Sequence, residues 1–382
     1  MKISVIGSTC SSKDEAVVFA GRAAGVCYMP SNFEALTSEP EQRTLARAKG
    51  TLLSGHHSVY DHITYNLLIE DIPKILAMVL NNEGFYTTSE KSARYTRMTM
   101  MDTDIERYTK WLSRFKKLID DRYGEKFRSF YADPKKAQKS IDKLAMENAR
   151  YMISVFTPTT MIYTVSLRQI NYIRNFFKFY CRDACDAFSD TLRQYMLEFE
   201  HALPDELKVK GLDADFKGRR ISLFRTIPKE EDYFGEVYSI SYLGSWAQLA
   251  QAQRHRTLSY QVEMLNEPLF YIPDILYEDY GLVEEWKEDM SALRGFFPQG
   301  QMVRIYERGT YDKFLLKCYE RICGCAQLEI MKQTRDILSQ YHNCRPDLIP
   351  TDFFRGARCT FPNFKCNNAC VWGGLNAITR KI

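Results

Sequence analysis

The spacing of hydrophobic positions predicts alternating strands and helices over the first half of the chain. Residues 14–25 place alanine and valine on one face of a helix. Short apolar runs predict a first strand at 3–6 and a buried strand at 63–69. Periodic apolar positions predict further helices at 41–53, 73–80, 104–123, 135–156 and 167–199.

A strand and a short helix recur in the second half. Residues 237–242 predict the strand, and 245–253 predict a helix with Trp246 and Leu249 at helical spacing. Between the two halves, residues 204–218 are polar and punctuated by glycine, which is typical of a linker. The chain is therefore predicted to divide into residues 1–203 and 219–382, the second part ending in a cysteine-rich tail.

The end of the second short helix carries an unusual group of polar side chains. Gln251, Gln253, Arg254, His255 and Arg256 place two guanidiniums, an imidazole and two amides within six positions. A solvated helix end explains such cations, because the negative end of the helix dipole favours them. An anion site is the alternative.

Two polar segments of the first half favour an anion site over a solvated helix end. Residues 55–62 read Gly-His-His-Ser-Val-Tyr-Asp-His, and residues 90–95 read Glu-Lys-Ser-Ala-Arg-Tyr. Together with Arg-His-Arg at 254–256, they resemble the signature of the flavin-dependent thymidylate synthases. That signature is a Gly-His-x-Ser-x-x-Glu-His block, then Arg-His-Arg, two residues and Ser, then Glu-x-Ser-x-Arg-Tyr.

The signature is split between the two halves of this chain. At 81–84 the first half reads Asn-Asn-Glu-Gly where the family has Arg-His-Arg, but it keeps the tail at 90–95. The second half keeps 254–256 and Ser259 but reads Val-Glu-Met-Leu-Asn-Glu at 262–267. The resemblance implies an α+β fold of two tandem, divergent copies of the family's antiparallel sheet with long helices, fused as a pseudo-dimer.

The resemblance also implies one complete nucleotide site made from both halves, because each half lost what the other kept. Arg321, where the first half has Phe177, is implied as the catalytic group that stabilises the anionic form of a uracil ring. The implied substrate-binding residues are Gln251, Arg254 and Arg321 from the second half, and Glu90, Ser92, Ala93, Arg94 and Arg150 from the first. Taken singly, Arg150, Arg168 and Arg321 would by default be interpreted as exposed helix residues.

A flavin site is implied in the same way. There is no Gly-x-Gly-x-x-Gly segment after a strand and no Gly-Lys-Ser phosphate loop, so neither of those nucleotide-binding modes is supported. Asp61 replaces the family's Glu, Ser166 its Asn, and Tyr172 a further Asn. The implied FAD-binding residues are His56, Ser58, Asp61, Ser166 and Arg168 from the first half, and Arg254, His255 and Arg256 from the second.

The implied reaction is the reductive methylation of dUMP to dTMP, with FAD as cofactor and NADPH and methylenetetrahydrofolate as cosubstrates. One alternative is a C5-methylase or hydroxymethylase of UMP or another uridine nucleotide. A second is a noncatalytic nucleotide-binding homologue. Because the family is homotetrameric, two fused chains are expected to form a homodimer.

Composition narrows the partners and the location. The 382 residues are 45% hydrophobic, enough to bury sizeable cores, and the net charge of +4 does not argue for nucleic acid or a membrane surface. With no signal peptide or transmembrane run expected, we predict a cytoplasmic location, where most of the eleven cysteines stay reduced. The cysteines near the end do not match the spacing of structural zinc sites, so no metal is expected.

Overall fold

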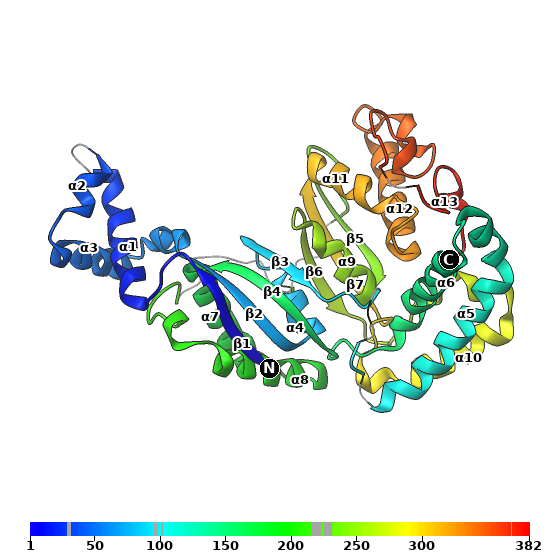
Figure 1. The fold of residues 1–382 in the computed structure, drawn as a ribbon, viewed down its shortest axis with the longest axis horizontal. Helices are drawn as coiled ribbons and strands as arrows, with labels where there is room; N and C mark the ends of the chain where they lie inside the picture. Colours follow the sequence, from blue (N-terminus) through cyan, green and yellow to red (C-terminus); the bar gives the residue numbers. More distant parts are fainter. Residues whose placement is uncertain are drawn as a thin grey trace. The chain divides into compact units, whose positions relative to one another are not determined.

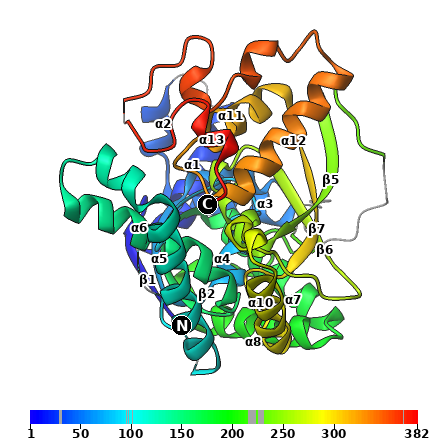
Figure 2. The same ribbon diagram turned by 90° about the vertical axis from the view of Figure 1, so that its right-hand side faces the viewer.

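The computed structural model describes residues 1–28, 32–94, 96, 98–100, 102–214, 223–224, 231–367 and 369–382. The chain packs into two compact units, one of Met1–Lys91 with Pro158–Ile221, the other of Ser92–Thr157 with Ser222–Ile382. Figures 1 and 2 show the chain coloured along its sequence. The units differ from the predicted boundary at residues 203–219, because the long helices after residue 102 pack with segments of the second half of the chain.

The first unit is built on a four-stranded antiparallel sheet in the order β1-β2-β4-β3. Its strands are β1 (Lys2–Ser8), β2 (Thr64–Pro73), β3 (Tyr86–Glu90) and β4 (Pro158–Ser166). Its helices are α1 (Lys13–Gly25), α2 (Phe33–Thr37), α3 (Glu41–Leu53), α4 (Lys74–Leu80), α7 (Leu167–Asp183) and α8 (Ala187–Ala202).

Two helix predictions in the first half were too long. The helix predicted over 167–199 is two helices, because Asp186 begins α8 by accepting a hydrogen bond from the backbone N–H of Ser189. The helix predicted over 135–156 stops at Ala149, where α6 (Pro134–Ala149) passes into the 3₁₀ turn η3 (Arg150–Met152).

The predicted linker is largely packed structure. Asn171 of α7 donates to the carbonyl of Leu207, and Asn175 donates to the carbonyls of Leu212 and Asp213. Leu207, Leu212 and Asp213 are fully buried. Residues 204–213 therefore belong to the first unit, whereas 215–222 lie outside the described residues.

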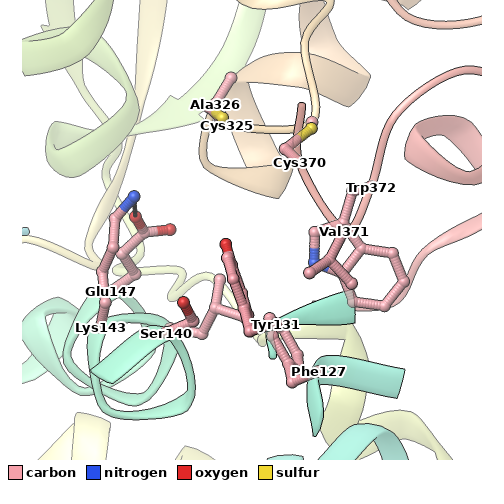
Figure 3. Close-up of a pocket in the computed structure, with 12 residues that line it drawn as sticks. Phe127, Tyr131, Ser140, Lys143, Glu147, Cys325, Ala326, Cys370, Val371 and Trp372 are labelled. Carbon is pink, nitrogen blue, oxygen red and sulfur yellow. Dashed lines mark ion pairs between the residues drawn. The ribbon is translucent and has the colours of Figure 1, made fainter. Parts of the chain in front are cut away.

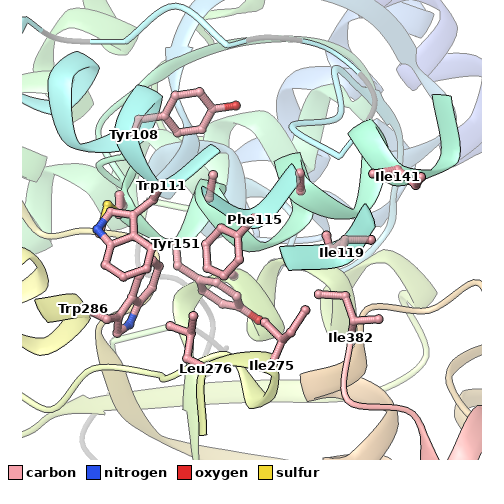
Figure 4. Close-up of a cluster of buried hydrophobic side chains, with 14 of the residues drawn as sticks. Tyr108, Trp111, Phe115, Ile119, Ile141, Tyr151, Ile275, Leu276, Trp286 and Ile382 are labelled. Carbon is pink, nitrogen blue, oxygen red and sulfur yellow. The ribbon is translucent and has the colours of Figure 1, made fainter. Parts of the chain in front are cut away.

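The second unit is built on a three-stranded antiparallel sheet in the order β5-β7-β6. A hydrophobic cluster joins the long helices to residues 275–293, which connect two strands of this sheet in the chain, and to the C-terminal tail (Figure 4). In it, the rings of Trp111 and Trp286 meet edge to face with centroids 4.9 Å apart. The elements are α5 (Asp102–Phe130), α6, β5 (Val237–Ser245), α9 (Trp246–Ala252), β6 (Ser259–Met264), α10 (Tyr280–Ala292), β7 (Met302–Thr310), α11 (Tyr311–Arg321), α12 (Leu328–Cys344) and α13 (Asn376–Thr379).

The two sheets repeat one arrangement, and the prediction of an α+β fold with antiparallel sheets and long helices is confirmed. The succession β2, α4, β3, β4, α7 and α8 recurs as β5, α9, β6, β7, α11 and α12. The order β2-β4-β3 in the first sheet matches β5-β7-β6 in the second, and β1 is an additional edge strand of the first. Helices α4 and α9 each have 7 residues, and strands β4 and β7 each have 9. Equivalent positions of the two repeats follow by counting from matching element ends. Aligning the strand ends Ser166 and Thr310 pairs Phe177 with Arg321 and Arg150 with Arg294. Aligning the helix starts Lys74 and Trp246 pairs Asn82 with Arg254, Glu90 with Val262, and Arg94 with Asn266.

Equivalent segments of the two repeats also exchange equivalent hydrogen bonds within the second unit. The N–H of Val155 donates to the carbonyl of Phe297 over 2.9 Å, and the N–H of Gln299 donates to the carbonyl of Ile153 over 2.8 Å. By the same count Val155 corresponds to Gln299, and Ile153 corresponds to Phe297. Ser154 pairs with its own counterpart, Pro298, at the centre. This is the reciprocal pattern of a two-fold contact.

Candidate nucleotide and flavin site

Four of the predicted site arginines belong to the second unit. Arg94 follows β3 in the chain, and Arg150 lies in η3. Arg254 lies in the 3₁₀ turn η6 (Gln253–His255) that follows α9, and Arg321 is the last residue of α11. The positive charges of Arg94 and Arg254 act on both Arg150 and Arg321. The structure thus brings together arginines that are spread over more than half of the sequence.

Arg150 and Arg321 are placed where a cation is costly. Burial first, and then the positive charges of Arg94 and Arg254, lower the pKa of Arg150 to about 10. The same causes lower the pKa of Arg321 to about 10. Each guanidinium donates to one backbone carbonyl, Arg150 to Ala247 and Arg321 to Gln251, both over 2.7 Å. The Nε of each is buried without a hydrogen-bond partner. A bound anion would satisfy these donors and offset the repulsion.

Sequence reasoning missed the carboxylate that fixes Arg94. The Nε of Arg94 donates to Glu147 over 2.7 Å, and its Nη2 donates to the carbonyl of Cys325 over 2.6 Å. Glu147 is itself buried. Its position three residues before Arg150, hence on the same side of the helix end, was the available signal.

A hydrogen-bond chain anchors Gln251. Its amide donates to Gln327, and Gln327 donates to the hydroxyl of Tyr151 over 2.6 Å. Tyr151 in turn donates to Glu329 over 2.8 Å, and Glu329 accepts from the N–H and hydroxyl of Ser245, which begins α9. The Oε1 of Gln251 is a buried acceptor without a partner. Buried polar groups therefore fix the relative positions of α9, η3 and the start of α12.

Helix α11 is held by a buried ion pair one turn before Arg321. Lys317 donates to Glu307 of β7 over 2.5 Å, and both side chains are fully buried. The hydroxyls of Tyr238 and Tyr242 donate to the same carboxylate over 2.7 and 2.8 Å. The helix that carries Arg321 is thus fixed to two strands of the sheet.

The first-half flavin residues of the prediction lie in the first unit, and three of them contact one another. Asp61 accepts from the hydroxyl of Ser166 and from Arg168, each over 2.8 Å. Arg168 also donates to Asp213 over 3.0 Å. Ser58 is exposed in the turn η2 (His57–His62), and His56, directly before this turn, is exposed as well. Asp213, in the segment expected to be a linker, was missed.

The remaining predicted residues divide between the units. Glu90 lies at the end of β3 in the first unit, where it pairs with Lys74. Ser92 and Ala93 belong to the second unit, and the hydroxyl of Ser92 accepts from the N–H of Arg94. Arg256 is exposed in the left-handed region at φ 56°, and His255 lies beside it in the chain.

The described residues contain neither a membrane-spanning helix nor a cluster of metal-binding side chains. Across the described ranges, no helix is both long and apolar enough to cross a membrane. In the same part of the chain, no group of three or more His, Cys, Asp or Glu side chains is placed to hold a metal ion.

The fold is an antiparallel α+β framework, and the arginine Nε atoms that are buried in it without a hydrogen-bond partner are donors suited to an anion. A sequence profile described as thymidylate synthase complementing protein matches residues 5–204 of this chain. The chain therefore belongs to this family.

Individual relatives cover about half of the chain. A flavin-dependent thymidylate synthase of Clostridium tetani is 23% identical over 201 residues, 50% of this chain and 80% of that protein. A crystal structure of the flavin-dependent thymidylate synthase of Helicobacter pylori, complexed with FAD and dUMP, aligns with a TM-score of 0.31 and 17% identity, covering 54% of this chain and 95% of that one. A UMP/dUMP methylase of Streptomyces cacaoi aligns with a TM-score of 0.28 and 17% identity over 46% of this chain and 76% of that one.

Proposed function

We propose that this protein methylates dUMP reductively to dTMP, with FAD as cofactor and methylenetetrahydrofolate and NADPH as cosubstrates. Family membership supports the class of reaction. The observation that carries the proposal is the group of four arginines in the second unit, two of them with buried, unpartnered Nε atoms. Charge of this density is expensive unless an anion such as a nucleotide phosphate offsets it.

In this proposal each arginine has a separate task. Arg94 and Arg150, with the Ser92 hydroxyl, grip the phosphate through charge-assisted hydrogen bonds. Arg321 contacts the uracil ring and stabilises its anionic form, which raises the nucleophilicity of the ring carbon that is methylated. Gln251 accepts a hydrogen bond from the ring through its unpartnered Oε1.

The residues of the second unit fit a flavin dinucleotide better than those of the first. Arg254 and Arg256 are exposed cations two positions apart, suited to a pyrophosphate. Arg168 is already paired with Asp61 and Asp213, which neutralise its charge. We therefore assign Arg254, His255 and Arg256 to the flavin phosphates. When bound, FAD supplies hydride transfer.

We infer further that the chain is a fused pseudo-dimer. The repeated strand order and the reciprocal hydrogen bonds of Val155 and Gln299 support this, because a two-fold contact between identical subunits has the same pattern. Two such chains are expected to associate as a homodimer, which light scattering of the purified protein tests.

The absorption spectrum of the purified protein tests the flavin assignment. Bound oxidised flavin gives visible bands, and these are expected to shift when dUMP is added because both bind one site. A protein that stays colourless after incubation with FAD would contradict the enzyme proposal and favour a noncatalytic nucleotide-binding role. Turnover of UMP without turnover of dUMP would show that UMP, and not dUMP, is the substrate.

Mixing variants tests whether a complete site forms within one chain. Arg94→Ala and Arg254→Ala are each expected to abolish dTMP formation. Because both arginines belong to the same compact unit, mixing the two variants is expected to restore no activity. Recovery on mixing would show that the site is assembled between chains.

A further inference from the structure

A small cavity in the second unit brings two cysteines together. It has a volume of about 70 Å³ and is lined in part by Cys325, Cys370, Glu147, Lys143 and Trp372 (Figure 3). Cys325 follows α11 in the chain, whereas Cys370 lies in the C-terminal tail, so the cavity joins two distant segments. Cys325 is exposed and Cys370 is half-buried, which leaves both thiols within reach of small reagents.

The two segments approach closely enough to hold both thiols in place. A Cβ added to Gly324 would lie 2.4 Å from the carbonyl oxygen of Trp372, so glycine is required where the backbones meet. Arg380 donates to the carbonyls of Gly324 and Ala326, on either side of Cys325. The tail is therefore packed against the Cys325 loop through backbone contacts.

The two thiols differ in acidity. A hydrogen bond from Cys325 and the backbone N–H of Trp372 lower the pKa of Cys370 to about 7, against the effect of burial. A hydrogen bond from Cys323 lowers the pKa of Cys325, but the hydrogen bond to Cys370 and burial outweigh it, so this pKa is raised. Cys370 thus carries much of its sulfur as thiolate at neutral pH, the form that attacks oxidants.

The cavity wall also holds Arg94. Its guanidinium contacts the carboxylate of Glu147 and the carbonyl of Cys325, and both of these residues line the cavity. A change in the backbone at Cys325 therefore changes the surroundings of an arginine that the proposed function assigns to the substrate phosphate.

We propose that Cys325 and Cys370 are a redox modification site, a dithiol that peroxide converts to a disulfide and that thereby displaces Arg94. The Cys370 thiolate attacks hydrogen peroxide, forming an S–O bond while the O–O bond breaks and hydroxide leaves as water after taking a proton. The Cys325 thiol then attacks the resulting sulfenic acid, forming the S–S bond while a second water leaves. Two electrons pass from the sulfurs to peroxide, and a dithiol reductant reverses the change.

Peptide mapping tests the pair directly and needs no nucleotide. The full chain is treated with hydrogen peroxide, blocked with N-ethylmaleimide and digested for mass spectrometry. A linked peptide joining Cys325 to Cys370 is expected, lost in Cys370→Ser and kept in Cys344→Ser, whose thiol is exposed and does not line the cavity. Oxidation of other cysteines while Cys325 and Cys370 both react with the maleimide would overturn the pair.

Two measurements test the effect on Arg94. Hydrogen exchange of the peptides containing Arg94 and Glu147 is expected to be faster in the oxidised chain, and unchanged by peroxide in Cys370→Ser and Cys325→Ser. The dissociation constant for dUMP, which rests on the proposed function, is expected to rise about ten-fold on oxidation and to return with dithiothreitol. Unchanged exchange in a chain with the mapped disulfide would overturn the coupling, whereas absence of dUMP binding in the reduced chain would overturn the proposed function alone.

Discussion

The two sheets have the same strand order but different interiors. Where the second repeat buries the ion pair of Glu307 and Lys317, counting from the equivalent strand and helix ends gives Tyr163 and Ile173 in the first repeat, both fully buried. Val79 of α4 stands where α9 has Gln251, and Asn82, just after α4, stands where Arg254 follows α9. One framework therefore supports either an apolar core or a charged one.

This difference teaches that the buried charges are not required by the fold. The first repeat forms the same strands without them, so they are not needed for the topology. Burying a salt bridge is often no more stabilising than apolar packing. Lys317 precedes Arg321 by one helical turn, and its partner is fixed by two tyrosine hydroxyls. The repeat that keeps the predicted catalytic arginine is the one that keeps its ionic support.

The largest effect is expected from Arg150→Ala compared with Arg294→Ala. The two residues occupy equivalent positions, but Arg150 is buried in the arginine group and Arg294 is exposed. Arg150→Ala is expected to lower kcat/KM for dUMP by about 10²–10³-fold, as for loss of a charged contact to the reacting substrate. Arg294→Ala is expected to leave it within about two-fold, because surface changes away from a site have small effects. Steady-state dTMP formation measures both, and equal losses would mean that both repeats bind substrate.

A smaller effect, on stability, is expected when the second core is converted toward the first. Lys317→Ile leaves the Glu307 carboxylate buried without its cation, and is expected to lower the free energy of unfolding by about 3–5 kcal/mol. The double variant Lys317→Ile with Glu307→Tyr is expected to be more stable than Lys317→Ile, because no buried charge remains uncompensated. Urea unfolding followed by circular dichroism measures both. A double variant less stable than the single one would show that lost packing, and not the unpaired charge, causes the loss in the free energy of unfolding.

The smallest effect concerns the left-handed residue after each short helix. Gly84 has φ 59° and its equivalent Arg256 has φ 56°. Gly84→Ala is expected to lower the free energy of unfolding by about 1–2 kcal/mol, and Arg256→Gly to raise it by under about 1 kcal/mol. Arg256→Gly should at the same time weaken FAD binding, because a proposed phosphate contact is lost.

Gly50→Ala in α3 is the control for this pair. Gly50 lies in a helix with open space around it, so alanine is expected to stabilise there by up to about 1 kcal/mol. Thermal unfolding of the three variants separates backbone conformation from side-chain volume. An Arg256→Gly variant that is less stable would show that the arginine side chain holds the turn.

The sequence predicted most helices of this fold, since periodic apolar positions survive divergence, but it missed several strands and boundaries. Strand β4 alternates buried and less buried positions, but it lies between the helices predicted over 135–156 and 167–199, where no strand was predicted. The break between α7 and α8 depends on one N-cap, Asp186, which no periodicity indicates. Asp213 was hidden because a polar, glycine-containing stretch predicts a linker, although tertiary contacts bury it.

Site residues could be predicted where they belong to a sequence motif. Residues that only hold another site residue in position could not. Arg94, Arg150, Arg254 and Arg321 followed from the motif, and the structure places all four in one unit. Their roles stay predictions. Glu147 and Gln327 have no motif of their own, because their function is defined by contacts made across distant segments.

The reciprocal contact of residues 153–155 with 297–299 lies within a single covalent chain. An interface between separate subunits must repay the translational and rotational freedom lost on association, and it dissociates on dilution. Segments tethered in one chain meet at a fixed effective concentration whatever the amount of protein. A contact of so few hydrogen bonds can therefore persist here, and each side is free to diverge without having to match a copy of itself.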